Sequence, residues 1–200
     1  MIRCCIALLL SLVLLPAHSA TLLVLGDSIS AGYGIDAGKG WVELMRDQLG
    51  EEHQVINASI SGETTSGGVR RIRPLLRTHQ PQIVVLALGA NDGLRANGPQ
   101  HIEHNLEAMI ESAKRQNALV LLIGIRLPPN YGASYSDAFG AVFPHLAERH
   151  HLPLVPFLLK NVAEHEELMQ TDRHHPTARA QPLILDNVWP KLLQLLRTLP

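Results

Sequence analysis

Short apolar runs alternate with amphipathic stretches along most of this chain, and that alternation constrains the fold more than any other feature. Five runs have the length and apolar content of buried strands: residues 21–25, 55–58, 83–88, 119–125 and 153–156. Elsewhere, apolar side chains recur every three or four positions, as on one face of a helix, within residues 41–49, 69–76, 102–113, 135–150 and 178–196. Pro74, Pro182 and Pro190 lie in helical stretches, where proline kinks a helix or marks its start.

This order of elements predicts an α/β fold. Strands that alternate with helices form βαβ units, and strands that are apolar throughout belong to parallel sheets covered on both faces. We therefore predict a five-stranded parallel sheet between two helix layers, doubly wound in a flavodoxin-like order. At 200 residues and 46% hydrophobic, the chain has the length and apolar content of a single domain.

Charge and aromatic content argue against a nucleic-acid partner. The chain has 17 basic and 18 acidic residues, a formal net charge of −1, and its basic residues form no continuous run. Aromatic residues make up 4% of the chain, too few for a base-stacking surface. We expect a monomer that binds a small-molecule substrate and no nucleic acid.

The first 19 residues have the pattern of a secretory signal peptide. Arg3 precedes an apolar run at residues 6–15, a proline ends the run, and small residues suit cleavage before Ala20. A run of ten is too short for a transmembrane helix, which needs about 20 apolar residues. We predict a signal peptide at residues 1–19, a single domain at residues 20–200, no stable membrane anchor, and a periplasmic or secreted protein.

Polar or glycine-rich loops follow three of the predicted strands and precede the last predicted helix. Ser28 follows the first strand, Gly62 the second and Asn91 the third. Asp172 stands three residues before His175, ahead of the last helix. Taken singly, each is ordinary, because serine and aspartate cap helices, and glycine and asparagine are common in turns. In a doubly wound sheet, however, the loops at the carboxyl ends of the strands meet at one site.

Together these loops supply the parts of a serine hydrolase. A serine on a strand-to-helix turn exposes its hydroxyl as a nucleophile. A histidine can act as its base, with a carboxylate that fixes the imidazole tautomer. His174 is the alternative to His175 as this base. A metal site is disfavoured, because the histidines are scattered and no His-Glu-x-x-His motif occurs. We expect no metal and no cofactor.

At these residues the chain resembles the SGNH (GDSL-type) hydrolase family, and within it the bacterial periplasmic thioesterase I, lysophospholipase and arylesterase subgroup. The resemblance runs from Leu22 to about Leu196. The matching blocks are Gly26-Asp27-Ser28, Ser61-Gly62-Glu63-Thr64-Thr65, Gly89-Ala90-Asn91-Asp92 and Asp172-x-x-His175-Pro176, with Ile125-Arg126-Leu127-Pro128-Pro129-Asn130-Tyr131-Gly132 as the subgroup's signature. One such block is a weak signal, whereas four in order are a strong one.

The resemblance implies a three-layer α/β/α SGNH hydrolase fold and assigns a role to each candidate residue. Ser28 is the expected nucleophile, His175 the base and Asp172 its partner. The Ser28 N–H, the Gly62 N–H and the Asn91 side chain are the expected oxyanion hole. An acyl-enzyme would form on the serine and then be hydrolysed by water.

The resemblance also implies acyl substrates: esters, aryl esters, thioesters such as acyl-CoA, and lysophospholipids. Their acyl chains need an apolar groove. The expected groove residues are Leu94 and Gly98, in a loop at residues 94–100 that could close as a lid, and Leu127, Pro128 and Tyr131 on a facing wall.

The chain departs from the family pattern at three positions near the site. Arg173 and His174 stand where glycine and isoleucine are common, and Glu63 stands where aspartate is frequent. These departures concern the detail of the loops rather than the expected roles.

Three other functions remain open at this point. A carbohydrate O-deacetylase of the same superfamily would prefer acetyl esters. A non-catalytic flavodoxin-like module would bind a phosphate-bearing ligand, although the chain has no glycine-rich phosphate loop. A peptidase is the third, with no peptide-binding feature to support it.

Overall fold

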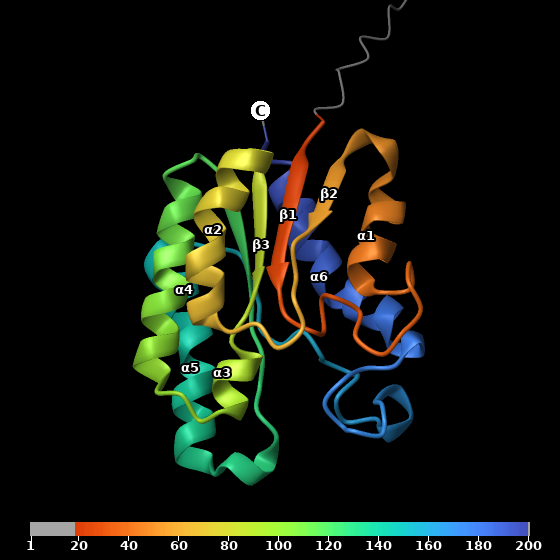
Figure 1. Ribbon diagram of the computed structural model, residues 1–200, viewed down its shortest axis with the longest axis vertical. Coiled ribbons are helices and arrows are strands. Elements are labelled where there is room, and N and C mark those ends of the chain that lie inside the picture. The colour runs from red at the N-terminus through yellow and green to blue at the C-terminus, as the bar shows by residue number, and fades with distance from the viewer. Residues whose placement is uncertain (1–18, 200) are drawn as a thin grey trace, which may run out of the picture.

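A single five-stranded parallel sheet forms the centre of the computed structural model, which describes residues 19–199 (Figure 1). The strands are β1 (Thr21–Gly26), β2 (Gln54–Asn57), β3 (Ile83–Ala87), β4 (Leu119–Ile123) and β5 (Leu154–Val155). Their order is β2-β1-β3-β4-β5, and every neighbouring pair is parallel. This is the predicted flavodoxin-like order, and each strand lies within two residues of its predicted bounds.

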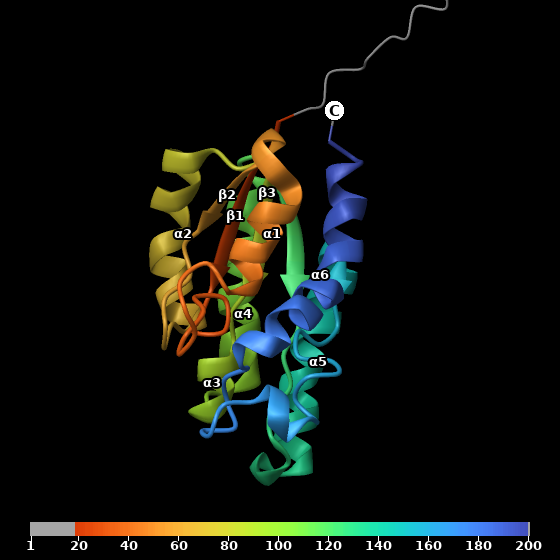
Figure 2. The same ribbon diagram turned by 90° about the vertical axis from the view of Figure 1, so that its right-hand side faces the viewer.

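Helices cover both faces of the sheet, as predicted (Figure 2). α1 (Trp41–Leu49) and α6 (Gln181–Leu196) pack on one face, and α2 (Thr65–His79), α4 (Pro99–Lys114) and α5 (Ala133–His150) pack on the other. A short helix, α3 (Ala90–Leu94), follows β3. Single 3₁₀ turns occur at Gly50–Glu52, Pro129–Tyr131, Glu166–Leu168 and Ala178–Ala180.

Two hydrophobic cores result from the alternation of side chains along each strand. In β1, Leu22 and Val24 face the α1–α6 side, while Leu23 and Leu25 face the α2–α4–α5 side, and all four are fully buried. Burial of one such side chain stabilises the fold by about 1.5–3 kcal/mol. The same pattern in each strand holds the sheet between its helix layers and fixes where its carboxyl-terminal loops emerge.

Three prolines lie inside helices without ending them: Pro74 in α2, Pro144 in α5 and Pro190 in α6. Pro74 and Pro190 are exposed, so water can reach the carbonyl that each leaves without an N–H donor. Pro182 stands in the first turn of α6, where proline is well tolerated. The last helix is shorter than predicted, because its first three residues form the 3₁₀ turn Ala178–Ala180.

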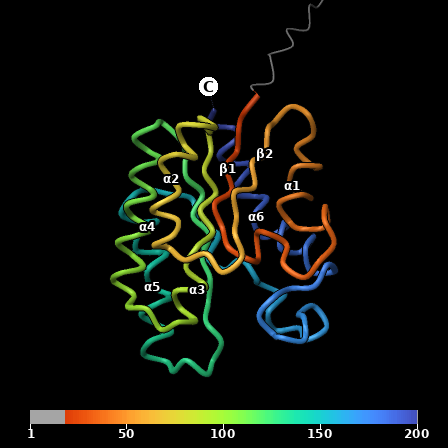
Figure 3. Tube along the Cα trace, viewed as in Figure 1, coloured from red at the N-terminus to blue at the C-terminus, as the bar shows by residue number. Residues whose placement is uncertain are grey.

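The loops at the carboxyl ends of the strands gather at one end of the molecule, and both ends of the described chain lie at the other (Figure 3). The predicted signal peptide, apart from Ser19, lies outside the described residues. None of the helices within residues 19–199 is long and apolar enough to span a membrane.

Candidate active site

Ser28 lies in the tight turn that follows β1, with its side chain largely buried. Its Oγ is 2.8 Å from Nε2 of His175, a residue 147 positions further along the chain. The turn needs glycine at position 26, because a Cβ there would lie 2.6 Å from Oγ and 2.7 Å from Cβ of Ser30. The serine hydroxyl is therefore held within hydrogen-bond reach of a base.

His175 is oriented by Asp172. Nδ1 of His175 lies 2.6 Å from Oδ2 of Asp172, and Oδ1 accepts hydrogen bonds from the backbone N–H groups of His174 (2.9 Å) and His175 (3.0 Å). Burial by itself raises the pKa of Asp172, but the hydrogen bonds from His175 and from these N–H groups outweigh it and hold the pKa well below its usual range. The carboxylate stays ionised beside the imidazole.

Two further residues hold His175 in place, and sequence analysis assigned neither a role. The ring of Tyr33 packs on the imidazole with centroids 4.5 Å apart. The backbone N–H of Gln170 donates to the His175 carbonyl at 2.7 Å. Its side-chain amide donates to the carbonyls of Tyr33 (2.8 Å) and Pro176 (3.0 Å). Gln170 thus joins the histidine loop to the loop that follows Ser28.

Each of the three groups expected to form an oxyanion hole has an N–H free to donate. The backbone N–H groups of Ser28 and Gly62 make no hydrogen bond within the described part of the chain. Gly62 has φ 78°, a conformation that glycine adopts without strain. Nδ2 of Asn91, at the start of α3, donates to the Glu63 carbonyl at 3.0 Å, which leaves its second amide hydrogen available.

A buried polar network fixes the loops that carry these donors. Both carboxylate oxygens of Asp92, which is fully buried, accept from Thr65, one from its N–H (2.8 Å) and one from its hydroxyl (2.7 Å). Glu63 pairs with Arg71 at 2.9 Å, and Arg71 also donates to the Ala58 carbonyl at 2.6 Å. Glu63, which stands where the family pattern often has aspartate, therefore links the Gly62 turn to α2 through Arg71.

Asp27 is a second buried carboxyl group at the site. Its Oδ1 accepts from the N–H of Ile29 at 3.1 Å. Burial raises its pKa from 3.8 to about 6, against the lowering effects of the Ile29 hydrogen bond and of the nearby His175. In the sequence this residue is marked only by its place in the Gly26-Asp27-Ser28 block.

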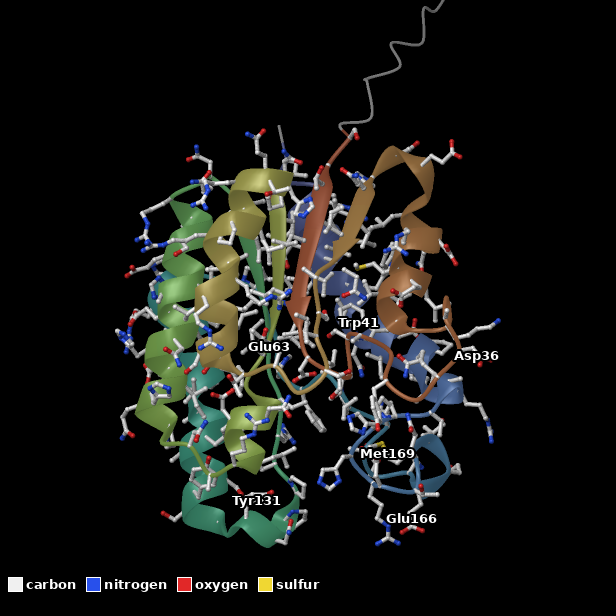
Figure 4. The ribbon with its side chains drawn as sticks, in the orientation of Figure 1. Asp36, Trp41, Glu63, Tyr131, Glu166 and Met169 are labelled. Atoms are coloured by element: carbon white, nitrogen blue, oxygen red, sulfur yellow. The ribbon has the colours of Figure 1, made fainter. Side chains whose placement is uncertain are left out.

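A cavity of about 500 Å³ opens beside Ser28 and His175, and its lining is largely apolar. The apolar lining includes Ile29, Leu94, Ile125, Leu127, Phe157 and Met169. Figure 4 shows Tyr131 and Met169 on separate segments at the lower end of the view, with Glu63 above Tyr131. A cavity of this volume and lining can hold an apolar substituent next to the reactive groups.

The expected substrate-binding residues divide into two groups. Leu94, Leu127 and Pro128 line the cavity, whereas Gly98 and Tyr131 do not. Gly98 instead precedes the first turn of α4. The Tyr131 hydroxyl donates to the Leu94 carbonyl at 3.0 Å. This tyrosine therefore stabilises the segment after Asn91 and does not form a wall of the cavity.

The sequence offers two alternative roles for histidines, His174 as the base and a metal site. Nδ1 of His174 lies 2.6 Å from the Asp172 carbonyl oxygen, and this histidine makes no hydrogen bond with Ser28. Within residues 19–199, no three His, Cys, Asp or Glu side chains converge in a way that could hold a metal ion.

Comparison with known proteins places this architecture in a family. The model of the GDSL-like lipase/acylhydrolase family matches residues 24–182. Esterase TesA of Pseudomonas aeruginosa is 48% identical over 94% of this chain and 96% of its own. Thioesterase 1/protease 1/lysophospholipase L1 of Escherichia coli K12 is 46% identical, over 88% of this chain and 86% of its own. The psychrotrophic esterase EstA from Pseudoalteromonas sp., in a crystal structure inhibited by monoethylphosphonate, superposes with a TM-score of 0.85 at 40% identity, covering 90% of this chain and 100% of its own.

Proposed function

Since this chain belongs to the GDSL-like lipase/acylhydrolase family and is an ester hydrolase, we propose that it cleaves its substrates by a two-step acyl transfer on Ser28. The observation that carries the proposal is the unbroken chain of short contacts from Ser28 Oγ to His175 (2.8 Å) and from His175 to Asp172 (2.6 Å). This is the arrangement that a serine nucleophile, a general base and an orienting carboxylate require.

In the first step, Nε2 of His175 takes the proton of the Ser28 hydroxyl while Oγ forms a bond to the carbonyl carbon of the substrate. The negative charge on the carbonyl oxygen is stabilised by the N–H groups of Ser28 and Gly62 and the amide of Asn91. The tetrahedral intermediate then breaks its bond to the leaving alcohol or thiol, which takes the proton from His175. Asp172 keeps the imidazole in the required tautomer throughout.

In the second step, water attacks the acyl-enzyme. His175 takes a proton from the water as its oxygen bonds to the acyl carbon, and the same three donors stabilise the second oxyanion. The bond to Ser28 Oγ then breaks, and the serine recovers its proton from His175. Each proton thus passes through one nitrogen, Nε2, which faces the serine in the resting enzyme.

The cavity supports acyl chains longer than acetyl as substrates. An apolar space of about 500 Å³ beside the nucleophile would be left unfilled by an acetyl group. We therefore favour medium- or long-chain esters, thioesters such as acyl-CoA, and lysophospholipids over the acetyl esters of a deacetylase. The names of the relatives, which include esterase, thioesterase and lysophospholipase, agree with this range.

We also propose that the protein works as an exported monomer. All five proposed catalytic and oxyanion residues come from one chain, so no second copy is needed to complete the site. Export is supported by the signal-peptide pattern at residues 1–19. The mass of the protein in periplasmic and cytoplasmic fractions tests export: a periplasmic chain that begins near Ala20 supports it, and a protein that stays in the cytoplasm with residues 1–19 attached contradicts it.

The experiment that tests the proposed function is hydrolysis of p-nitrophenyl esters from acetyl to palmitoyl by the wild-type protein and by Ser28→Ala. We expect the activity to rise from acetyl toward longer chains and to be lost in the variant. Activity confined to the acetyl ester would favour a deacetylase. Equal activity of the two proteins would show that Ser28 is not the nucleophile.

A further inference from the structure

Four arginines gather on one outer face of the molecule, away from the cavity. Arg70, Arg73 and Arg77 are spaced three and four residues apart on α2, so they lie on one side of that helix, and all three are exposed. Arg115 follows the end of α4, which lies alongside α2 on the same side of the sheet (Figures 1 and 2). We call these four residues the arginine face.

Most of the charge on this face is not neutralised by the protein. Arg115 pairs with Glu111 at 3.2 Å. Arg70, Arg73 and Arg77 make no ion pair and no side-chain hydrogen bond within residues 19–199. A chain with a formal net charge of −1 therefore concentrates unpaired positive charge along one helix.

The arginine face borders two adjoining hollows between α2 and α4. One, of about 640 Å³, is lined by Arg70, Arg73 and Arg115 and by three apolar residues, Val69, Ile72 and Ala108. Ser112 and Glu111, the partner of Arg115, complete its lining. The other, of about 190 Å³, is lined by Arg73, Arg77 and Arg115, with Leu76 as its apolar member. Guanidinium groups beside a partly apolar floor suit amphiphilic anions.

We propose that the arginine face docks the protein on a membrane surface that contains anionic phospholipids. Arg70, Arg73 and Arg77 form a row of charges along about 10 Å of the helix, and a lipid surface offers an array of phosphates to such a row. The choice of lipid as partner rests on the proposed action on lipid esters. Neither hollow has an aromatic lining residue, so the face lacks a platform for nucleic-acid bases.

Docking through α2 would hold the enzyme at the membrane surface by the helix that begins at the active-site end of the molecule. The first residue of α2, Thr65, is hydrogen-bonded to Asp92 and follows the Gly62 turn directly. The helix that carries the arginines therefore begins at the proposed oxyanion hole. An enzyme held by this helix would find its acyl substrates at a raised local concentration.

The test compares vesicle binding of the purified mature protein, a triple variant of the face and a matched triple variant. The first variant is Arg70→Gln/Arg73→Gln/Arg77→Gln. The control, Arg179→Gln/Lys191→Gln/Arg197→Gln, removes the same amount of charge from exposed positions around α6, on the other side of the sheet. Vesicles of phosphatidylcholine alone and of phosphatidylcholine mixed with phosphatidylglycerol are used, at low and high salt.

We expect the wild type and the control variant to bind the phosphatidylglycerol vesicles, and the α2 variant to bind them about 100-fold more weakly. Each arginine near an anionic surface contributes about fivefold to binding. High salt should abolish the binding, and phosphatidylcholine alone should not support it. Three results would overturn the proposal: equal binding by wild type and α2 variant, equal loss in both variants, or wild-type binding to duplex DNA but not to vesicles.

Hydrolysis of a soluble p-nitrophenyl ester in the same preparations separates this inference from the proposed function. The α2 variant should retain wild-type turnover, because none of its three arginines contacts the proposed catalytic residues. A wild type without turnover would contradict the acyl-transfer proposal, while the vesicle measurement would still decide whether the arginine face binds lipid.

Discussion

Asn91 shows how one side chain can serve both the loop and the reaction. Its amide donates one hydrogen bond to the Glu63 carbonyl, next to Gly62, and has a second hydrogen for the substrate oxyanion. The same contact that holds the Gly62 turn therefore brings the proposed donors together. Removal of the amide takes away a donor and loosens the turn.

We predict that Asn91→Ala lowers kcat by about 10²–10³-fold with little change in KM, since an oxyanion donor acts mainly in the transition state. Steady-state kinetics with a p-nitrophenyl ester measure both constants. Asn97→Ala is the matched control, because Asn97 lies in the same segment and its side chain contacts Asp92 rather than the nucleophile. A drop of similar size in the control would assign the effect to the loop instead of the amide.

The acid of the proposed triad gives a second prediction at this scale. Asp172→Asn keeps the shape of the side chain but removes the charge that stabilises a protonated His175, and the amide can favour the wrong tautomer. We expect kcat to fall by about 10³–10⁴-fold. Oδ1 also accepts hydrogen bonds from two N–H groups of the loop. Circular dichroism of the variant should therefore be measured with the kinetics, to check that its fold is intact. Retention of wild-type turnover would remove Asp172 from the mechanism.

At the scale of elements, the proposed triad is assembled from two loops that are far apart in sequence, and Gln170 ties them together. Its side-chain amide reaches the Tyr33 carbonyl across 137 residues and the Pro176 carbonyl within its own loop. Tyr33 in turn donates its N–H to the Ser28 carbonyl at 3.0 Å. This amide therefore helps to set the distance between Ser28 and His175.

We predict that Gln170→Glu lowers kcat about 10- to 100-fold, because a carboxylate of the same shape cannot donate to the two carbonyls, and small misplacements of a base are costly. The KM for a p-nitrophenyl ester should change little. Gln194→Glu, an exposed substitution of the same charge on α6, serves as the control. If both variants turn over at the wild-type rate, the link through Gln170 has no bearing on catalysis.

The sequence predicts the elements better than it predicts the contacts between them. The central strands β1, β3 and β4 are almost entirely apolar and buried, so their existence and their parallel pairing follow from pattern alone. The short helix α3 was not foreseen, because five residues are too few for a helical period to be visible.

Some residues of the site are likewise easier to predict from the sequence than others. Ser28, Gly62, Asn91, Asp172 and His175 stand in local motifs, so their gathering at one sheet end could be predicted. Tyr33 and Gln170 act through contacts between distant loops, for which a single sequence contains no periodic or motif signal. Tyr131 was expected on the wall of the groove because its motif lies nearby, but only the fold reveals that its hydroxyl faces Leu94.

At the scale of the whole molecule, the buried Asp27 should make stability depend on pH. Its pKa in the folded protein, about 6, is higher than its ordinary value of 3.8. Between these values the unfolded chain has released this proton while the folded protein still holds it, so the free energy of unfolding falls as pH rises. Above pH about 6 the full cost, about 3 kcal/mol, is present.

We predict that Asp27→Asn gains stability relative to the wild type as pH rises from about 4 to about 7, by up to about 3 kcal/mol, and that the difference is constant above that range. Urea unfolding at several pH values measures it. The low pKa of Asp172 acts in the other direction and at lower pH, where protonation of its carboxylate removes stability. A stability difference that does not vary with pH would mean that Asp27 is not buried as described.

The identity of the nucleophile is the central claim, and covalent labelling tests it most directly. The protein is treated with a p-nitrophenyl ester of an alkylphosphonate. The oxygen of an activated serine bonds to the phosphorus as p-nitrophenolate leaves, which gives a stable adduct, and the modified peptide is identified by mass spectrometry. We predict one adduct per chain, on Ser28, absent in Ser28→Ala and formed far more slowly in His175→Ala. An adduct on another serine, such as Ser30 two residues away, or full ester hydrolysis by a protein that carries the label on Ser28, would contradict the account.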